Sequence, residues 1–134
     1  TGIPAALAQG VASLGLGPFG IIAMLTAVYL VLGTALDGVS MIVLTTSIVV
    51  PIVDRAGFDL VWFGIFIVLL VELAEVTPPL GFNLFVMQTM TGKEQTEVAL
   101  ASLPFFLMLV LTVALITAFP VTLVTGLPDV LLSR

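Results

Sequence analysis

The chain has 134 residues, of which 60% are hydrophobic and only 8% are charged. Soluble domains carry about 25% charged residues, so lipid or neighbouring helices must cover much of this apolar surface. The net charge of −5 argues against nucleic acid as a partner, and the absence of cysteine and histidine excludes disulfides, thiol catalysis and the usual zinc sites. We therefore predict an all-α integral membrane protein.

The first eighteen residues are small, apolar and punctuated by glycine. The chain starts at Thr1 without a methionine or a basic flank, which predicts that it is part of a longer polypeptide. Within residues 1–18 we predict a short interfacial arm or connector helix, which Gly15, Gly17 and Pro18 bring to an end.

Two apolar runs follow, joined by the turn-forming pair Asp37-Gly38. A spanning helix needs about 20 residues, so Phe19–Leu36 is barely long enough and Val39–Val53 is short. In one interpretation the first run spans the membrane and the second is a short following element. In the other, residues 19–53 form a re-entrant helical hairpin whose tip, near residues 36–40, lies inside the bilayer. A carboxylate at that depth is costly unless it is functional.

A polar loop at residues 54–59 leads to a second interrupted element, residues 60–91, which is long for a single span. Its middle contains two adjacent prolines, which lack backbone N–H groups, followed by a glycine and an asparagine that favour a new helix start. We predict that the helix breaks at residues 77–83. At membrane depth an open backbone is tolerated only where it lines a cavity or is buried in protein.

A second polar loop at residues 92–97 precedes a last transmembrane helix at 98–125 and a short tail at 126–134. Two helix interruptions in one small membrane segment are typical of secondary transporters, in which freed carbonyls bind a cation and helix N-termini face anionic groups. A non-transporting membrane scaffold or assembly subunit is the alternative, although a scaffold has no need of such breaks. No nucleophile–base pairing or metal-ligand cluster indicates an enzyme.

Several short motifs occur in a fixed order along the chain: Leu36-Asp37-Gly38, Thr45-Thr46, Pro51, Gly57-Phe58-Asp59, Trp62-Phe63-Gly64, Glu72, Thr77-Pro78-Pro79, Gly81-Phe82-Asn83-Leu84-Phe85 and Gly92. In these motifs the chain resembles the large membrane subunit of tripartite ATP-independent periplasmic (TRAP) transporters. The resemblance covers most of the chain, and family subunits are about three times as long. It implies the carboxy-terminal part of the second inverted repeat, with residues 19–53 as a hairpin.

The resemblance also implies an elevator mechanism, Na⁺ as the coupling ion and no other cofactor. The expected location is multi-pass in the bacterial inner membrane, with a small membrane subunit and a periplasmic substrate-binding protein as partners. The implied substrate is an organic anion such as a C4-dicarboxylate or a sialic acid. For orientation, the family implies that the hairpin enters from the periplasm, whereas the positive-inside rule places Arg55 and Arg134 in the cytoplasm.

By the same resemblance, an ion and substrate site combines the hairpin tip with the facing helix break, and its expected residues are Asp37, Gly38, Ser40, Glu72, Thr77, Pro78, Pro79, Gly81 and Asn83. The Na⁺ ion is expected near Asp37, Gly38, Thr77 and Asn83. Glu72 matches a family acid, whereas Glu75 stands where the family more often has glutamine or an apolar residue. The two acids lie three residues apart and so share one helix face, where they bind a cation or a proton or contact hydroxyls of a neighbouring helix.

Overall fold

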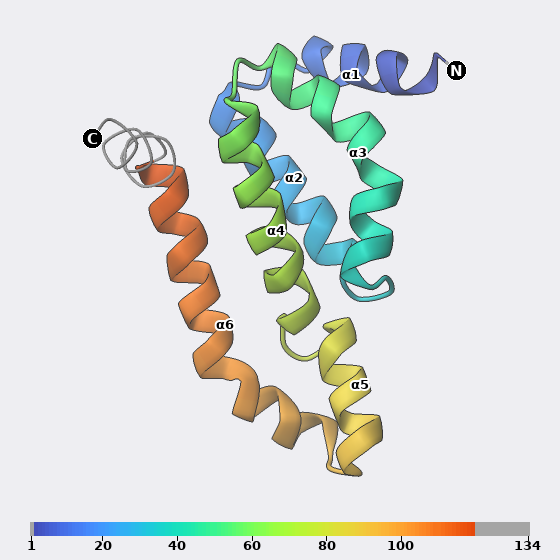
Figure 1. The fold of residues 1–134 in the computed structure, drawn as a ribbon, viewed down its shortest axis with the longest axis vertical. Coiled ribbons are helices and arrows are strands. Elements are labelled where there is room, and N and C mark those ends of the chain that lie inside the picture. The colour runs from blue at the N-terminus through green and yellow to red at the C-terminus, as the bar shows by residue number, and fades with distance from the viewer. Residues whose placement is uncertain (1, 120–134) are drawn as a thin grey trace, which may run out of the picture.

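A computed structural model describes residues 2–119, and within that range every regular element is an α-helix. This confirms the all-α prediction. The six helices, shown in Figure 1, are α1 (Ile3–Ser13), α2 (Pro18–Leu32), α3 (Gly38–Arg55), α4 (Leu60–Val76), α5 (Phe82–Thr91) and α6 (Gln95–Ala118). The end of the helix predicted at 98–125, the tail at 126–134 and Arg134 lie outside the described residues.

Helix α4 is the centre of the bundle because it is apolar on nearly all sides. Helices α2 and α3 run in opposite directions, and each packs more extensively on α4 than on the other. The largest fully buried side chains come from these three helices: Tyr29, Met41, Val53, Phe66 and Leu70. An apolar helix without a polar face can be packed from several directions, which is how α4 accommodates both arms of the hairpin and α6.

The two ends of the α2–α3 hairpin contact different parts of the chain. At its open end, α1 lies across α3, and the chain leaves α1 through Gly15, whose positive φ of 64° suits glycine. At its closed end, α2 stops at Leu32 and residues 33–37 form the tip. Figure 1 places this tip beside the interruption between α4 and α5. Two discontinuities distant in sequence therefore meet at one level of the bundle.

Helix α6 runs alongside both halves of the interrupted element. It has 24 residues, about 36 Å of helix, and contacts α5 near its start and α4 further along. At the far end, the Trp62 indole N–H donates to the carbonyl oxygen of Ile116 at 2.8 Å, and the Trp62 ring stacks between Phe58 and Phe66. These contacts hold α6 against α4.

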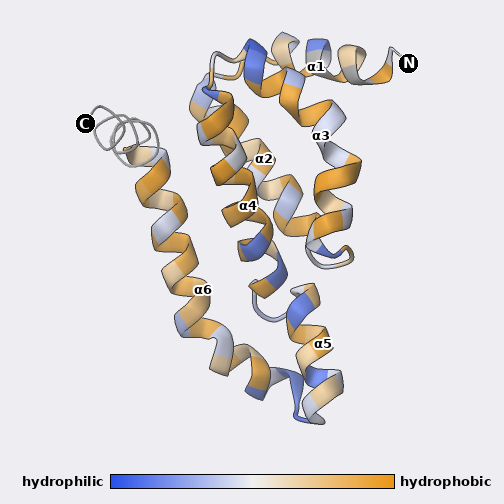
Figure 2. Cartoon of the chain, viewed as in Figure 1, coloured by the Kyte–Doolittle hydropathy of each residue, from blue (hydrophilic) through white to orange (hydrophobic). Residues whose placement is uncertain are grey.

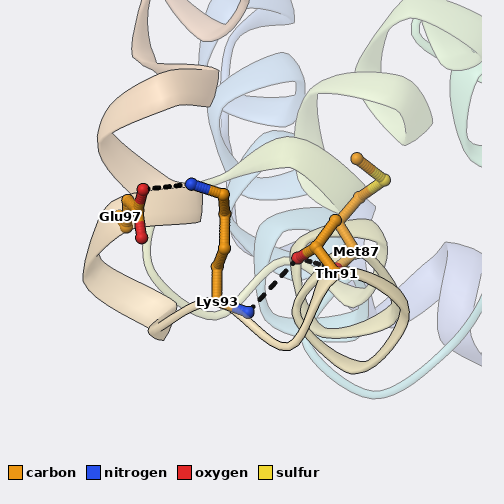
Figure 3. A network of polar contacts seen from close by, with 4 residues as sticks. All are labelled: Met87, Thr91, Lys93 and Glu97. Carbon is orange, nitrogen blue, oxygen red and sulfur yellow. Dashed lines mark hydrogen bonds and ion pairs between the residues drawn. The ribbon is translucent and has the colours of Figure 1, made fainter.

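Helix α6 begins at Gln95, three residues earlier than predicted. Around its start, Lys93 forms an ion pair with Glu97, and the Lys93 backbone N–H donates to the Thr91 hydroxyl at 3.5 Å (Figure 3). The Thr91 hydroxyl in turn donates to the carbonyl oxygen of Met87 at 2.7 Å. An acidic residue in the first turn of a helix is favourable, which accounts for the early start.

The polarity of the surface fits a membrane environment. Two of the described helices, α3 and α6, are long and apolar enough to cross a membrane. Much of α6 exposes large apolar side chains, including Leu100, Phe105, Met108 and Leu111. Figure 2 shows hydrophilic positions gathered at the lower end of α4, at the start of α5 and in the α5–α6 loop. Among the described residues the one buried charged side chain, that of Glu75, lies at the lower end of α4, where the hairpin tip meets the break.

Candidate functional site

The hairpin tip is organised by Asp37, which caps the N-terminus of α3. One carboxylate oxygen of Asp37 accepts the Ser40 backbone N–H at 3.1 Å, and the other accepts the Ser40 hydroxyl at 2.6 Å. Aspartate is a preferred N-cap because it satisfies amide groups that lack a helical partner. The side chains of Asp37 and Ser40 therefore satisfy each other within the tip.

The break between α4 and α5 folds the chain tightly over the end of α4. The Thr77 hydroxyl donates to the carbonyl oxygen of Leu73 at 2.7 Å, and the Pro78–Pro79 peptide bond is cis. The Thr77 carbonyl oxygen accepts the Gly81 N–H at 2.8 Å. A Cβ atom on Gly81 would lie only 2.2 Å from the carbonyl oxygen six residues earlier, at the end of α4. Only glycine fits this turn without a shift of the backbone.

Backbone contacts join the tip to the break. Gly33, the first residue after α2, lies so close to α4 that a Cβ atom there would be 2.5 Å from the Ala74 Cβ. The Gly33 carbonyl oxygen also accepts the backbone N–H of Phe82, the first residue of α5, at 2.9 Å. The end of α2, the end of α4 and the start of α5 thus meet. We call this meeting point, residues 33–38 with residues 74–83, the junction.

Glu75 is the buried acid of the junction, with only 6% of its surface exposed. Its Oε2 accepts a hydrogen bond from the Asn83 side-chain amide at 2.7 Å. The carboxyl group also lies against the start of α3, since a Cβ atom on Gly38 would lie only 2.8 Å from Oε1. Glu72, one turn earlier, is exposed. One carboxylate therefore touches the hairpin tip, α4 and α5.

Two clefts open beside the junction. The acidic cleft, about 340 Å³, is lined by Asp37, Gly38, Glu72, Glu75 and Asn83 together with apolar side chains. The neutral cleft, about 430 Å³, has no charged residue in its wall and is lined by Thr34, Ala35, Pro79, Leu80, Phe82, Phe85 and Gln95. Either space is large enough for a small solute with its water.

The predicted site residues divide between these features. Four line the acidic cleft and one lines the neutral cleft, while Ser40, Thr77, Pro78 and Gly81 line neither and instead shape the backbone of the tip and the break. Within residues 2–119, no group of three acidic, histidine or cysteine side chains is placed to hold a metal ion. A cation at the junction would therefore depend on carbonyl and hydroxyl oxygens as well as on carboxylates.

Sequence reasoning gave too little weight to three residues: Glu75 and Gly33 in the junction, and Gln95, which contacts it. Glu75 could have been found, since an acid inside an apolar helix without a nearby cation is a functional candidate by default. Gln95, whose side chain donates to the Pro79 carbonyl oxygen at 2.8 Å, gave no signal because it lies in a polar loop in the sequence. Gly33 gave none either, because glycine is common in apolar runs.

Comparisons with known proteins agree with this architecture. The family described as "Tripartite ATP-independent periplasmic transporter, DctM component" matches residues 1–122. The C4-dicarboxylate TRAP transporter large permease protein DctM of Pseudomonas aeruginosa is 31% identical over 118 residues, 88% of this chain and 28% of that protein. The isethionate TRAP transporter permease protein DctMQ of Oleidesulfovibrio alaskensis is 34% identical over 117 residues, 87% of this chain and 18% of that protein.

A third relative, the sialic acid TRAP transporter permease protein SiaT of Haemophilus influenzae, is 30% identical over 115 residues, 86% of this chain and 18% of that protein. The chain thus spans less than a third of the length of these relatives. The family match over most of the chain, with the relatives that share it, shows that this chain belongs to the DctM family of TRAP transporter permeases.

Proposed function

We propose that this chain forms one half of the ion and substrate site of a Na⁺-coupled permease that moves an organic anion across the bacterial inner membrane. The observation that carries the proposal is the junction. A hairpin tip and a helix break, far apart in the sequence, place polar groups and two clefts inside an otherwise apolar bundle. Such broken helices are where secondary transporters bind their solutes.

The break supplies oxygen atoms suited to Na⁺. Pro78 and Pro79 have no N–H, so the carbonyl groups of Ala74 and Glu75 lack their usual helical donors. The Ala74 carbonyl accepts only a long contact of 3.4 Å from the Thr77 backbone N–H. We place the ion near Asp37, Gly38, Thr77 and Asn83, as the family resemblance implies, because hard cations prefer such carbonyl, hydroxyl and carboxylate oxygens.

The anion needs a different kind of partner. The cationic side chains of the described residues, Arg55 and Lys93, line neither cleft at the junction. Helices α3 and α5 both begin at the junction, and helix N-termini attract anions. We propose that these two N-termini and residues from the rest of the permease receive the anionic groups of the substrate, with Glu72 and the neutral cleft completing the solute environment.

The same proposal covers the assembly. The relatives are named as transporters of C4-dicarboxylate, isethionate and sialic acid, so we propose an organic acid of this general class as substrate. We propose that α2 and α3 form the re-entrant hairpin of an elevator-type second repeat, entering from the periplasm. The partners are a small membrane subunit and a periplasmic substrate-binding protein, with the surrounding lipid covering the exposed face of α6.

Substitution of Thr77 or Asn83 tests this function in the intact permease. Thr77→Ala and Asn83→Ala should each abolish Na⁺-driven uptake into proteoliposomes while membrane insertion stays normal. Thr112→Ala is the matched control, because the Thr112 hydroxyl also donates to the carbonyl oxygen four residues earlier, but on the exposed face of α6. That variant should transport normally. Uptake at the wild-type rate in both junction variants would refute the proposal.

A further inference from the structure

Glu75 is placed differently from the other acids among residues 2–119, because its carboxylate lies against all three parts of the junction. It belongs to α4, accepts the Asn83 amide of α5 through Oε2 at 2.7 Å, and its Oε1 lies against Gly38 at the start of α3, beside the hairpin tip. The absence of a side chain on Gly38 is necessary for this contact, since a Cβ atom would lie 2.8 Å from Oε1. Removal of this side chain would remove the only side-chain hydrogen bond that joins α4 to α5 among residues 2–119.

The chemistry of the contact suits a side chain with acceptor oxygens. The Asn83 amide donates to Oε2 while Oε1 lies against Gly38 at the N-terminus of α3, and an ionised carboxylate offers two acceptor oxygens and no donor of its own. Hydrogen bonds to a charged acceptor are shorter and stronger than neutral ones. A charge with so little exposed surface is costly unless it is paired in this way. This geometry favours a role for Glu75 in holding the elements together over a role in binding a ligand.

We infer that Glu75 is a positioning residue that ties the hairpin tip to the start of α5 and so sets the width of both clefts. The bond from the Phe82 N–H to the Gly33 carbonyl oxygen is the only hydrogen bond that joins the tip directly to α5 among residues 2–119. Loss of the Glu75 tie leaves the tip held to α5 by that single bond. The tip then separates from the break, and the site that both elements form loses its geometry.

The separation can be measured directly with a pair of cysteines in the intact permease in membranes. Ala35→Cys places a thiol on the tip and Leu80→Cys places one on the break; both positions are exposed and both line the neutral cleft. A short bifunctional thiol reagent should cross-link this pair efficiently when Glu75 is present. Glu75→Leu, of similar size but without acceptors, should lower the cross-linking yield several-fold.

Two further substitutions separate hydrogen bonding from charge and bulk. Glu75→Gln should keep the cross-linking yield, because the glutamine oxygen can take the place of Oε1 against Gly38 and its amino group can donate to the Asn83 oxygen once the Asn83 amide is turned. Glu72→Gln is the matched control. Glu72 lies one turn away in the same cleft and makes no side-chain hydrogen bond with the described residues, so cross-linking should be unchanged.

A reciprocal exchange tests the pair without an apolar substitution that could prevent folding. Asn83→Asp sets a second carboxylate against Glu75 and should lower the cross-linking yield by repulsion. Adding Glu75→Gln to that variant should restore the yield, because the glutamine amide can donate to the new carboxylate. Failure of the rescue, or an unchanged yield in Glu75→Leu, would overturn the inference.

The effect on uptake rests on the proposed function, whereas cross-linking does not. If Glu75 positions the ion site, Glu75→Leu should raise the half-saturating Na⁺ concentration by about tenfold or more, and Glu75→Gln should raise it far less. A lower cross-linking yield with normal uptake in Thr77→Ala and Asn83→Ala would support the tie and refute the ion site. A normal yield in Glu75→Leu with no uptake in those two variants would refute the tie and support the ion site.

Discussion

Replacement of Gly33 by alanine should force the hairpin away from α4. Gly33 has helical backbone angles, φ −64° and ψ −10°, which alanine adopts without strain, so the effect is purely steric. The new Cβ would lie 2.5 Å from the Ala74 Cβ and 2.8 Å from the Ala74 carbonyl oxygen. Carbon atoms pack best at about 3.5–4.0 Å, so the end of α2 must move outward by roughly 1 Å.

That movement has two costs. Overpacking of a close contact costs about 1–3 kcal/mol. A shift of roughly 1 Å also stretches the 2.9 Å hydrogen bond from Phe82 to Gly33 beyond its useful range, which costs about 0.5–1.5 kcal/mol more. Together these give about 1.5–4.5 kcal/mol, or roughly a 10- to 1,600-fold shift in the equilibrium between a docked and a displaced hairpin.

Thermal unfolding of the purified permease and Na⁺-driven uptake measure this shift. Gly33→Ala should lower the transition temperature by several degrees and weaken uptake. Gly64→Ala is the control, because Gly64 lies on the exposed side of α4, where a Cβ atom meets nothing within 4 Å. That change should be neutral or stabilising by about 0.5–1 kcal/mol. Equal transition temperatures and wild-type uptake in both variants would show that the hairpin does not approach α4 this closely.

Two other changes test parts of the fold around the junction. Trp62→Phe keeps most of the buried ring but removes the N–H that donates to the Ile116 carbonyl oxygen. It should lower the free energy of unfolding by about 1–2 kcal/mol, measured by thermal unfolding. An unchanged stability would mean that this bond does not hold α6 to α4. Asp37→Ala removes the cap of α3 and should cost about 1 kcal/mol, whereas Asp37→Ser should preserve stability because serine also caps helices. Equal transition temperatures for the two Asp37 variants would contradict the capping role.

The helix break and the tip could be predicted from the sequence because both depend on local backbone chemistry. Two prolines without N–H groups, followed by Gly81, end a helix wherever they occur, and the structure has α4 ending at Val76. Asp37 acts within its own tip, through Ser40 three residues later. Likewise, the hydroxyls of Thr45 and Thr46 donate to carbonyl oxygens four residues earlier in α3, as their helical context predicts.

The packing of the tip on the break could not be predicted, because it depends on residues far apart in the chain. The close approach of Gly33 to Ala74 and the contact of Gly38 with Glu75 join segments some forty residues apart. Helices α2 and α4 are apolar around most of their circumference, so no stripe of hydrophobic residues indicates which faces meet. For the same reason, sequence alone could not show that Glu75 turns into the junction while Glu72 faces outward.

The position of the break along the bundle has an electrical consequence. Helix α5 has ten residues, about 15 Å of helix, which is close to half of the roughly 30 Å hydrocarbon thickness of a bilayer. If α5 runs from one surface of the membrane to the junction, an ion bound at the proposed site would have crossed about half of the membrane voltage. Moving one elementary charge across a full membrane potential of 100 mV changes its free energy by about 2.3 kcal/mol, so moving it halfway changes its free energy by about 1.2 kcal/mol. The occupancy of a monovalent cation at this depth would change about sevenfold per 100 mV, so membrane potential itself would load or empty it.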